Sequence, residues 1–170
     1  MATTKQEGAP PSFYAKRIDE HTVEALLPWP PSVNHYWGKE IMLPAEYEIS
    51  RNIGTDGFYR WLKRNSRAKE YLTQEAKDFR TIVGLLVNVG KCGVGFKASL
   101  SMVMRVYPPD RRRRDLSNLY KAVEDALEAA GVFVNDEQIV EHHSKKMVET
   151  VKGGAIMVRI QSLVTKAEGK

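Results

Sequence analysis

The sequence predicts an α+β fold in which helices pack on a mixed β-sheet. Two helical apolar patterns, two alternating strand patterns and a glycine turn between two further β-rich segments support this prediction. Their order is strand, helix, strand, helix and hairpin. We expect one domain over residues 19–170, because 42% hydrophobic and 28% charged content is ordinary for a globular chain of 170 residues. Residues 1–18 are polar and broken by glycine and prolines, so we expect a disordered N-terminal arm.

The first strand is predicted over residues 22–27, where apolar residues occupy every second position. The sequence PWPP at 28–31 ends this strand, since proline cannot donate to a β-ladder. Residues 38–65 follow neither a helical nor a strand period and contain several glycines and aromatic residues. We expect a long loop insertion there.

A helix is predicted after this insertion, because apolar residues from Leu72 to Leu86 step by four and three. Ser66 is its candidate N-cap, and Gly90 lies beyond its end.

A strand over residues 99–107 precedes the second predicted helix. Its apolar residues alternate, and two prolines end it. The helix that follows spans residues 115–130, with Asp115 as the expected N-cap and Gly131 as the expected C-terminal stop.

The last third of the chain is β-rich. We expect a short strand at 132–134, then strands at 139–148 and 155–164 joined by a Lys-Gly-Gly turn at 152–154. This pattern predicts a terminal β-hairpin.

The formal net charge of +5 indicates an anionic partner, and the basic residues are clustered rather than spread. The clusters lie at 63–69, 111–114 and 145–146, whereas acidic residues become frequent only between 124 and 141. Such clustering favours a nucleic-acid groove.

Cys92 is the single cysteine, so an internal disulfide is excluded and a reducing cytoplasm is expected. No stretch has the length and apolarity of a membrane span or a signal peptide.

Two aspartates flank the second helix and can approach each other. The helix from Asp115 rises roughly 22 Å at about 1.5 Å per residue. The chain then reverses at Gly131, and extended residues to Asp136 recover roughly 17 Å at about 3.3 Å each. We therefore expect Asp136 beside Asp115, where two repelling carboxylates favour a bound cation. Oxygen ligands suit Mg²⁺, with Mn²⁺ as a substitute.

The segment at 110–139, DRRRRDLSNLYKAVEDALEAAGVFVNDEQI, resembles the RusA family of Holliday junction resolvases of bacteria and their phages. LPWPPSVNHYW at 27–37 and the Lys-Gly-Gly turn extend the similarity over residues 21–163. The resemblance implies a RusA-like fold and a homodimeric, Mg²⁺-dependent endonuclease that recognises branched DNA and cuts four-way junctions symmetrically in recombination and repair. The segment at 38–65 is longer than the family pattern.

The resemblance also assigns site residues. The family's first aspartate falls on Asp115, its lysine on Lys121 and its aspartate after the helix on Asp136. A further aspartate, expected two residues after the first, falls on Ser117, whose neutral hydroxyl cannot replace a carboxylate's charge. Three explanations stay open: Asp110, Glu137 or water completes the site, the protein binds junctions but cuts poorly, or the serine is a substitution.

Each assignment has a plainer alternative. Lys121 can be a solvated helix residue, Asp115 a helix cap and Asp136 a turn residue. The arginine run can be a solvated loop, although four adjacent guanidiniums repel one another and a phosphate relieves this. The lysines at 145–146 can equally protect a sheet edge. The expected DNA-binding residues are Arg111, Arg112, Arg113, Arg114, Asn118, Lys145 and Lys146.

His142 and His143 are expected on opposite faces of a strand, one toward the core and one at the surface, without a catalytic role. A wedge of Tyr36, Trp37 and Trp61 that opens the junction is a weaker suggestion. The main rival function is a non-catalytic branched-DNA-binding protein, which predicts junction affinity without cleavage. An RNA-binding α+β module is a third alternative, which predicts a preference for RNA over branched DNA.

Overall fold

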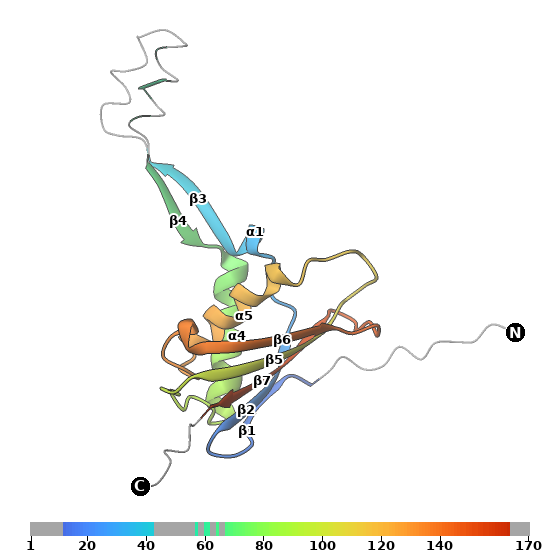
Figure 1. Ribbon diagram of the computed structural model, residues 1–170. Coiled ribbons are helices and arrows are strands. Elements are labelled where there is room, and N and C mark those ends of the chain that lie inside the picture. The colour runs from blue at the N-terminus through green and yellow to red at the C-terminus, as the bar shows by residue number, and fades with distance from the viewer. Residues whose placement is uncertain (1–11, 43–56, 58–59, 62–63, 65–66, 164–170) are drawn as a thin grey trace, which may run out of the picture.

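The computed structural model describes residues 12–42, 57, 60–61, 64 and 67–163. Helices and strands are labelled as in Figure 1. Their bounds are β1 Tyr14–Arg17, β2 Thr22–Pro28, α1 Val33–Tyr36, β3 Trp37–Met42, β4 Arg67–Leu72, α4 Gln74–Val89, β5 Leu100–Tyr107, α5 Ser117–Ala129, the 3-10 helix η1 Asp136–Gln138, β6 Ile139–Lys146 and β7 Ala155–Ser162.

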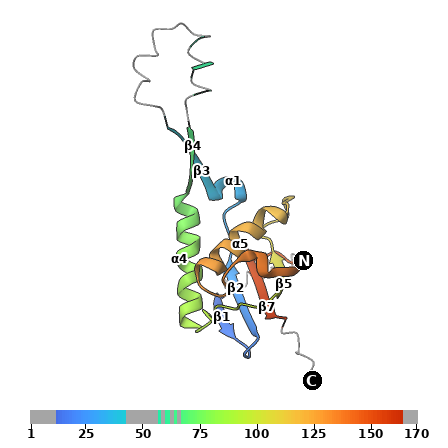
Figure 2. The same cartoon turned by 60° about the vertical axis from the view of Figure 1, so that its left-hand side comes forward.

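The main sheet is mixed and has the strand order β1-β2-β7-β5-β6. The β5 and β6 strands are parallel, and the other neighbouring pairs are antiparallel. Since two parallel strands need a crossover connection, α5 links the end of β5 to the start of β6. The α4 and α5 helices cover one face of the sheet (Figures 1 and 2). The predicted α+β fold with a mixed sheet is confirmed.

The strand alternation in the sequence matches the buried face of the sheet. In β2, Val23, Ala25 and Leu27 are buried. In β5, every second residue from Leu100 to Val106 is fully buried. These side chains form one core with the apolar faces of α4 and α5, so burial on a single face fixes the register of both strands.

The predicted terminal hairpin is wrong, because β6 and β7 do not pair with each other. The β5 strand lies between them and pairs with both. Burial explains the arrangement: β7 is mostly buried and central, whereas β6 is mostly exposed and forms the sheet edge. The glycine turn at 152–154 therefore carries the chain across the end of β5. The short strand predicted at 132–134 is only an isolated bridge between Phe133 and Phe96.

The expected N-terminal arm of residues 1–18 is wrong for its last part. Tyr14–Arg17 form β1, which pairs with β2 in antiparallel register. The polar composition concealed this strand because an edge strand of four residues needs little apolar surface, and only Ala15 is buried. Residues 1–11 lie outside the described part of the chain.

The expected loop insertion at 38–65 begins within one strand of a β-hairpin and stops before the other strand, and this hairpin was not predicted. The β3 and β4 strands pair from Trp37 with Leu72 to Met42 with Arg67. This hairpin extends away from the main sheet (Figure 1). Since β4 occupies 67–72, the helix begins later than predicted, and its N-cap is Thr73, whose Oγ1 accepts from the Ala76 amide at 3.3 Å. Ser66 lies outside the described residues.

The predicted C-terminal stop of α5 is confirmed. Gly131 has φ +77°, and its amide donates to the Glu128 carbonyl. The Val132 amide donates to the Leu127 carbonyl, which completes a Schellman motif. This reversal sends the chain back along α5 toward the site.

Gly131→Ala is expected to lower the free energy of unfolding by about 1 kcal/mol, because a Cβ is disfavoured in the left-handed conformation. No atom within 4 Å would meet the new Cβ, so the effect isolates the backbone. Gly84→Ala, within α4 and equally uncrowded, is the matched control and should stabilise by about 1 kcal/mol. Urea unfolding of both variants tests this, and equal effects of the same sign would contradict it.

Candidate functional site

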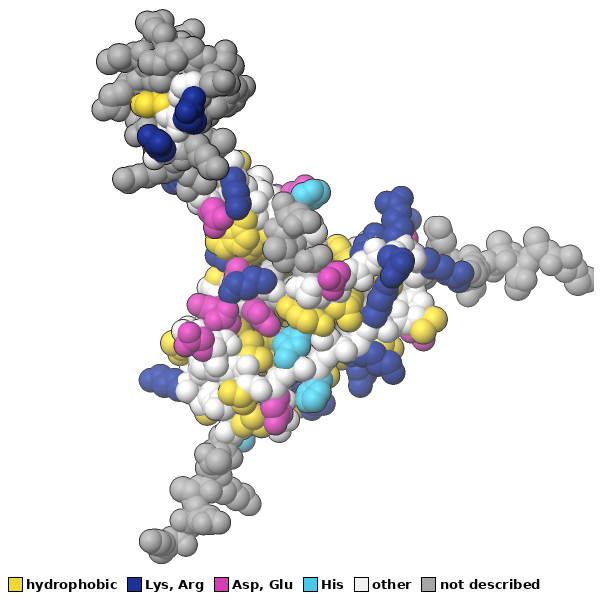
Figure 3. Space-filling model, turned by 45° about the horizontal axis from the view of Figure 1, so that its top comes forward, with side chains coloured by type: hydrophobic (Ala, Val, Ile, Leu, Met, Phe, Trp, Pro, Cys, Tyr) yellow, Lys and Arg dark blue, Asp and Glu magenta, His cyan; other side chains and the backbone are white. Residues whose placement is uncertain are grey.

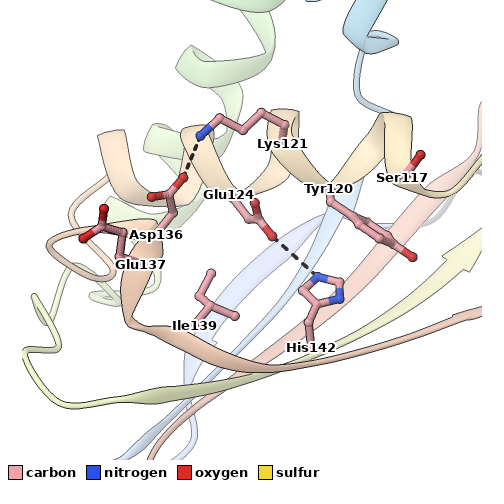
Figure 4. Close-up of a pocket in the computed structure, with 8 residues that line it drawn as sticks. All are labelled: Ser117, Tyr120, Lys121, Glu124, Asp136, Glu137, Ile139 and His142. Carbon is pink, nitrogen blue, oxygen red and sulfur yellow. Dashed lines mark hydrogen bonds and ion pairs between the residues drawn. The ribbon is translucent and has the colours of Figure 1, made fainter.

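An open pocket of about 520 Å³ lies between α5 and the segment that contains η1 and the start of β6 (Figure 4). Four residues of α5 line the pocket: Ser117 and the residues three, four and seven positions after it. This spacing places all four on one face of the helix. The return of the chain after Gly131 supplies the opposite wall. The lining residues are Ser117, Tyr120, Lys121, Glu124, Asp136, Glu137, Ile139 and His142.

Lys121 is held by two carboxylates. Its ammonium donates to Asp136 Oδ2 at 2.6 Å, across the pocket, and contacts Asp125 Oδ1 at 2.9 Å, one turn along α5. The hydrogen bond to Asp136, followed by that to Asp125, raises the pKa of Lys121. Lys121 is therefore an ammonium at any physiological pH, and it lies next to the candidate metal ligand.

Asp115 occupies a different place from the one predicted. It lines a neighbouring depression with Trp29, Arg114 and other residues, and it is not among those that line the Asp136 pocket. The expected meeting of Asp136 with Asp115 is replaced by contact with Lys121, because η1 returns to the second turn of α5 rather than to its start. The helix also begins at Ser117 with Leu116 as N-cap, so Asp115 is not the cap residue.

Ser117 lies at the first residue of α5 and on the pocket wall. Its amide donates to Asp115 Oδ1 at 3.0 Å, which links Asp115 to the pocket wall. The position at which the resemblance expects a carboxylate therefore does face the same pocket as Lys121 and Asp136, but it carries a hydroxyl.

The arginine run divides into one anchored residue and three exposed ones. Arg114 forms two hydrogen bonds with Asp110, at 2.5 and 2.8 Å, and its guanidinium lies over the Trp29 ring. This ion pair holds the pKa of Asp110 well below its usual range. Arg114 was among the residues expected to contact DNA, but its charge is balanced within the protein by Asp110. The exposed residues are Arg111, Arg112 and Arg113.

Lysine and arginine side chains gather at the end of the molecule where the loop between β5 and α5 lies, whereas acidic side chains gather over α5 and η1 (Figure 3). Lys145 and Lys146 are exposed on β6, the edge of the sheet. This position suits both DNA contact and protection of the sheet edge. Asn118 lies in the first turn of α5, and its side chain is outside the described part of the structure.

His142 and His143 point to opposite sides of β6, as predicted: His142 is partly buried and faces α5, and His143 is exposed. The His142 ring packs on Tyr120, with centroids 4.5 Å apart, and its Nε2 lies 3.6 Å from Glu124 Oε1. The sequence analysis did not single out Tyr120 or Glu124. Their spacing of three and seven positions after Ser117 places them on the same face of α5, and this spacing could have predicted them.

Glu124 and His142 form a desolvated pair rather than a strong salt bridge. The 3.6 Å separation is too long for a hydrogen bond, and His142 Nε2 is buried without a hydrogen-bond partner among the described residues. Burial raises the pKa of Glu124, and Lys121 opposes this shift, whereas burial lowers the pKa of His142. Both groups are thus shifted toward their neutral forms.

Glu124→Gln is expected to raise the Tm at pH 7 and to leave it unchanged at pH 4. The folded-state pKa of Glu124 is raised, so its protonated form contributes stability below the unfolded pKa of 4.5. That contribution is lost as the pH rises through the higher folded-state value, and glutamine does not ionise. Thermal unfolding at both pH values checks this. A variant less stable than the parent at pH 7 would contradict it.

The donor set of the pocket suits a hard divalent cation. Glu124, Asp136, Glu137 and Ser117 offer only oxygen atoms, as Mg²⁺ and Mn²⁺ prefer. Within the described ranges, however, no three His, Cys, Asp or Glu side chains converge closely enough to hold a metal as they stand. In this arrangement the Lys121 ammonium is the cation at Asp136.

A mixed sheet covered by helices, with a lysine and carboxylates in one pocket near a basic loop, defines a protein class suited to phosphate chemistry. The sequence model of the family described as Endodeoxyribonuclease RusA matches residues 59–161, more than half of the chain. The chain therefore belongs to the RusA family, which confirms the resemblance.

Relatives from bacteria and a phage resemble most of the chain. They are the crossover junction endodeoxyribonucleases RusA of Escherichia coli (strain K12), Enterobacteria phage 82 and Shigella sonnei (strain Ss046). Each is 29% identical over 143 residues, which cover 84% of this chain and 97% of the relative. In the part of the chain that the structure describes, no helix is long and apolar enough to cross a membrane.

Proposed function

We propose that this protein is a structure-specific endodeoxyribonuclease that resolves four-way DNA junctions. One observation carries the proposal: Ser117, Lys121 and Asp136, three of the four positions that the family resemblance assigns to catalysis, line a single pocket in a RusA-family chain. The relatives are named as crossover junction endodeoxyribonucleases.

We propose Mg²⁺ as the cofactor, with Mn²⁺ as a substitute. Asp136 would hold it, and Glu124, Glu137 and the Ser117 hydroxyl are further oxygen donors of the pocket wall. When bound, such an ion activates water and stabilises the charge that develops on the phosphate. Asp115 lines the neighbouring depression and is joined to the pocket residue Ser117 by a hydrogen bond, so it would contribute if its side chain turned toward the pocket.

The remaining residues position the DNA. Lys121 is a permanent ammonium on the pocket wall, so it can bind a phosphate oxygen or stabilise the leaving oxygen once Asp136 releases it. The exposed guanidiniums of Arg111, Arg112 and Arg113 can bind the phosphate backbone away from the pocket. Arg114, fixed by Asp110 and Trp29, shapes the loop that presents them.

A homodimer would place two such pockets on two strands of the junction, whose own two-fold symmetry matches a symmetric pair of subunits. We also propose that the single domain expected over residues 19–170 includes β1, which pairs with β2. Since the substrate is DNA and the relatives come from bacteria and a phage, the expected place of action is the cytoplasm of a bacterial cell.

A non-catalytic branched-DNA-binding protein is the second candidate. The observation that favours it is Ser117, which places a neutral hydroxyl on the pocket wall where a third charged ligand is expected. A divalent ion at Asp136 would then have less negative charge to balance it.

The test is to incubate the protein with a labelled synthetic four-way junction and with a linear duplex of the same sequence, in Mg²⁺ and in Mn²⁺. The nuclease proposal expects junction-selective binding and paired, symmetric nicks that disappear in EDTA. Tight junction binding without nicks in either ion would favour the non-catalytic protein. Equal binding of junction and duplex would overturn both candidates.

A further inference from the structure

The two carboxylates that hold Lys121 differ in how firmly they are fixed. Asp136 lies on the three-residue helix η1, and its side chain is 28% exposed. Asp125 lies within α5, and its side chain is only 9% exposed. A carboxylate buried to this degree needs cations beside it, because an unpaired buried charge is strongly destabilising.

Asp125 has a second cation on the side away from the pocket. Arg80 of α4 approaches its Oδ2 at 3.4 Å. The Nε of Arg80 donates to the Tyr36 hydroxyl at 2.7 Å, and its guanidinium lies over the Tyr36 ring. Tyr36 is itself buried at the end of α1, where the β3 strand begins. Three separate elements therefore fix the Asp125 carboxylate.

Asp136 is held less firmly. Among the residues that the structure describes, its side chain pairs with Lys121 alone, which it reaches from a surface turn. If Asp136 turns toward another cation, Lys121 loses that contact but keeps the one to Asp125. Of the two carboxylates that pair with Lys121, Asp136 is therefore the exchangeable partner and Asp125 the permanent one.

We propose that Asp125 is a positioning residue that holds the Lys121 ammonium at the pocket, and that Arg80 and Tyr36 fix Asp125 in turn. The relevance of this anchor to catalysis rests on the proposed nuclease function. The contact of Asp125 with Lys121 does not rest on that function, because it concerns only how well the Lys121 side chain is ordered. Asp125 does not line the pocket, so it acts through Lys121 and not on the DNA.

The order of the Lys121 side chain is the direct readout, measured by ¹³C relaxation of its ε-carbon and assigned by the loss of its signal in Lys121→Met. Lys121 should be rigid in the parent and mobile in Asp125→Asn. Asp78→Asn makes the same change on the exposed face of α4 and should leave Lys121 rigid. A rigid Lys121 in folded Asp125→Asn would overturn the proposal.

Arg80→Gln provides a second route if Asp125→Asn fails to fold. It leaves the carboxylate and Lys121 in place and removes the cation behind Asp125, together with the contacts of that cation to Tyr36. The proposal expects a Lys121 more mobile than in the parent. Unchanged order in Arg80→Gln would overturn the role given to Arg80 and Tyr36.

Cleavage and binding should separate in the same variants. Asp125→Asn is expected to lower the single-turnover cleavage rate by roughly 10- to 100-fold, as misplacement of a catalytic group does, while the junction Kd changes less than about twofold. In a Lys121→Met background the same substitution should have no further effect, because its route runs through Lys121. An equal loss in both backgrounds would indicate a merely structural role and overturn the proposal. If the parent itself does not cut, the proposed function fails, and the relaxation measurement still decides the anchor.

Discussion

Asp136→Asn is expected to lower the rate of junction cleavage by at least about 10³-fold, equivalent to roughly 4 kcal/mol of transition-state stabilisation. The substitution removes the charge of the proposed metal ligand on the η1 wall. It also weakens the contact across the pocket with Lys121, because a neutral amide replaces the charged acceptor of the ammonium. Both losses fall on groups that act in the chemical step, and neither removes a cation that binds DNA.

Junction affinity should therefore be retained or slightly increased in Asp136→Asn, because the variant is less negative. Glu141→Gln is the matched control: it removes one acidic charge from an exposed position of β6 that does not line the pocket. Its cleavage rate should stay within about twofold of the parent's, since surface changes away from a site have small effects. Full cleavage by Asp136→Asn, measured with a labelled junction under single-turnover conditions, would show that the pocket is not the active site.

Ser117→Asp is expected to raise the cleavage rate by roughly 100-fold, in proportion to about 2.7 kcal/mol of added electrostatic stabilisation. The new carboxylate would lie on the same pocket wall as Lys121 and supply the charge that the hydroxyl lacks. Ser117 is the first residue of α5, where a negative side chain also interacts favourably with the helix dipole. The substitution should therefore fold without penalty.

The rate is measured as a function of Mg²⁺ concentration, because a gain in metal binding should also lower the concentration for half-maximal cleavage. Ser117→Asn is the control: it has nearly the same size as aspartate but no charge, and it should not reproduce the gain. If Ser117→Asp cuts no faster than the parent, the serine is no deficiency and another group completes the site. Equal gains in both variants would show that the charge is not the cause.

The sequence predicted individual strands better than their partners. Alternation identified β2 and β5 because each buries one face, and Gly131 marked the end of α5 through its left-handed conformation. Proximity along the chain then suggested that the last two strands pair, but β5 lies between them. No local pattern encodes that choice, since it depends on which strand is buried enough to lie inside the sheet.

The site was predictable in part for the same reason. The family resemblance assigned Ser117 and Lys121, and their helical spacing places both on one face of α5. The reversal at Gly131 returns Asp136 to α5. The comparison of the helix rise with the extended return of the chain did not specify which turn of α5 Asp136 would meet. The anchor formed by Arg80 and Asp125 joins two helices, and only the tertiary structure brings these residues together.

The central claim is that Asp136 and the α5 wall hold the catalytic cation. It is tested most directly by a crystal structure of the protein soaked in Mn²⁺, with the ion located by its anomalous scattering. The expected result is a peak at the Asp136 carboxylate, with Lys121 displaced from Asp136 and still paired with Asp125. An intact Lys121–Asp136 ion pair at saturating Mn²⁺, with the ion bound elsewhere or absent, would contradict this assignment.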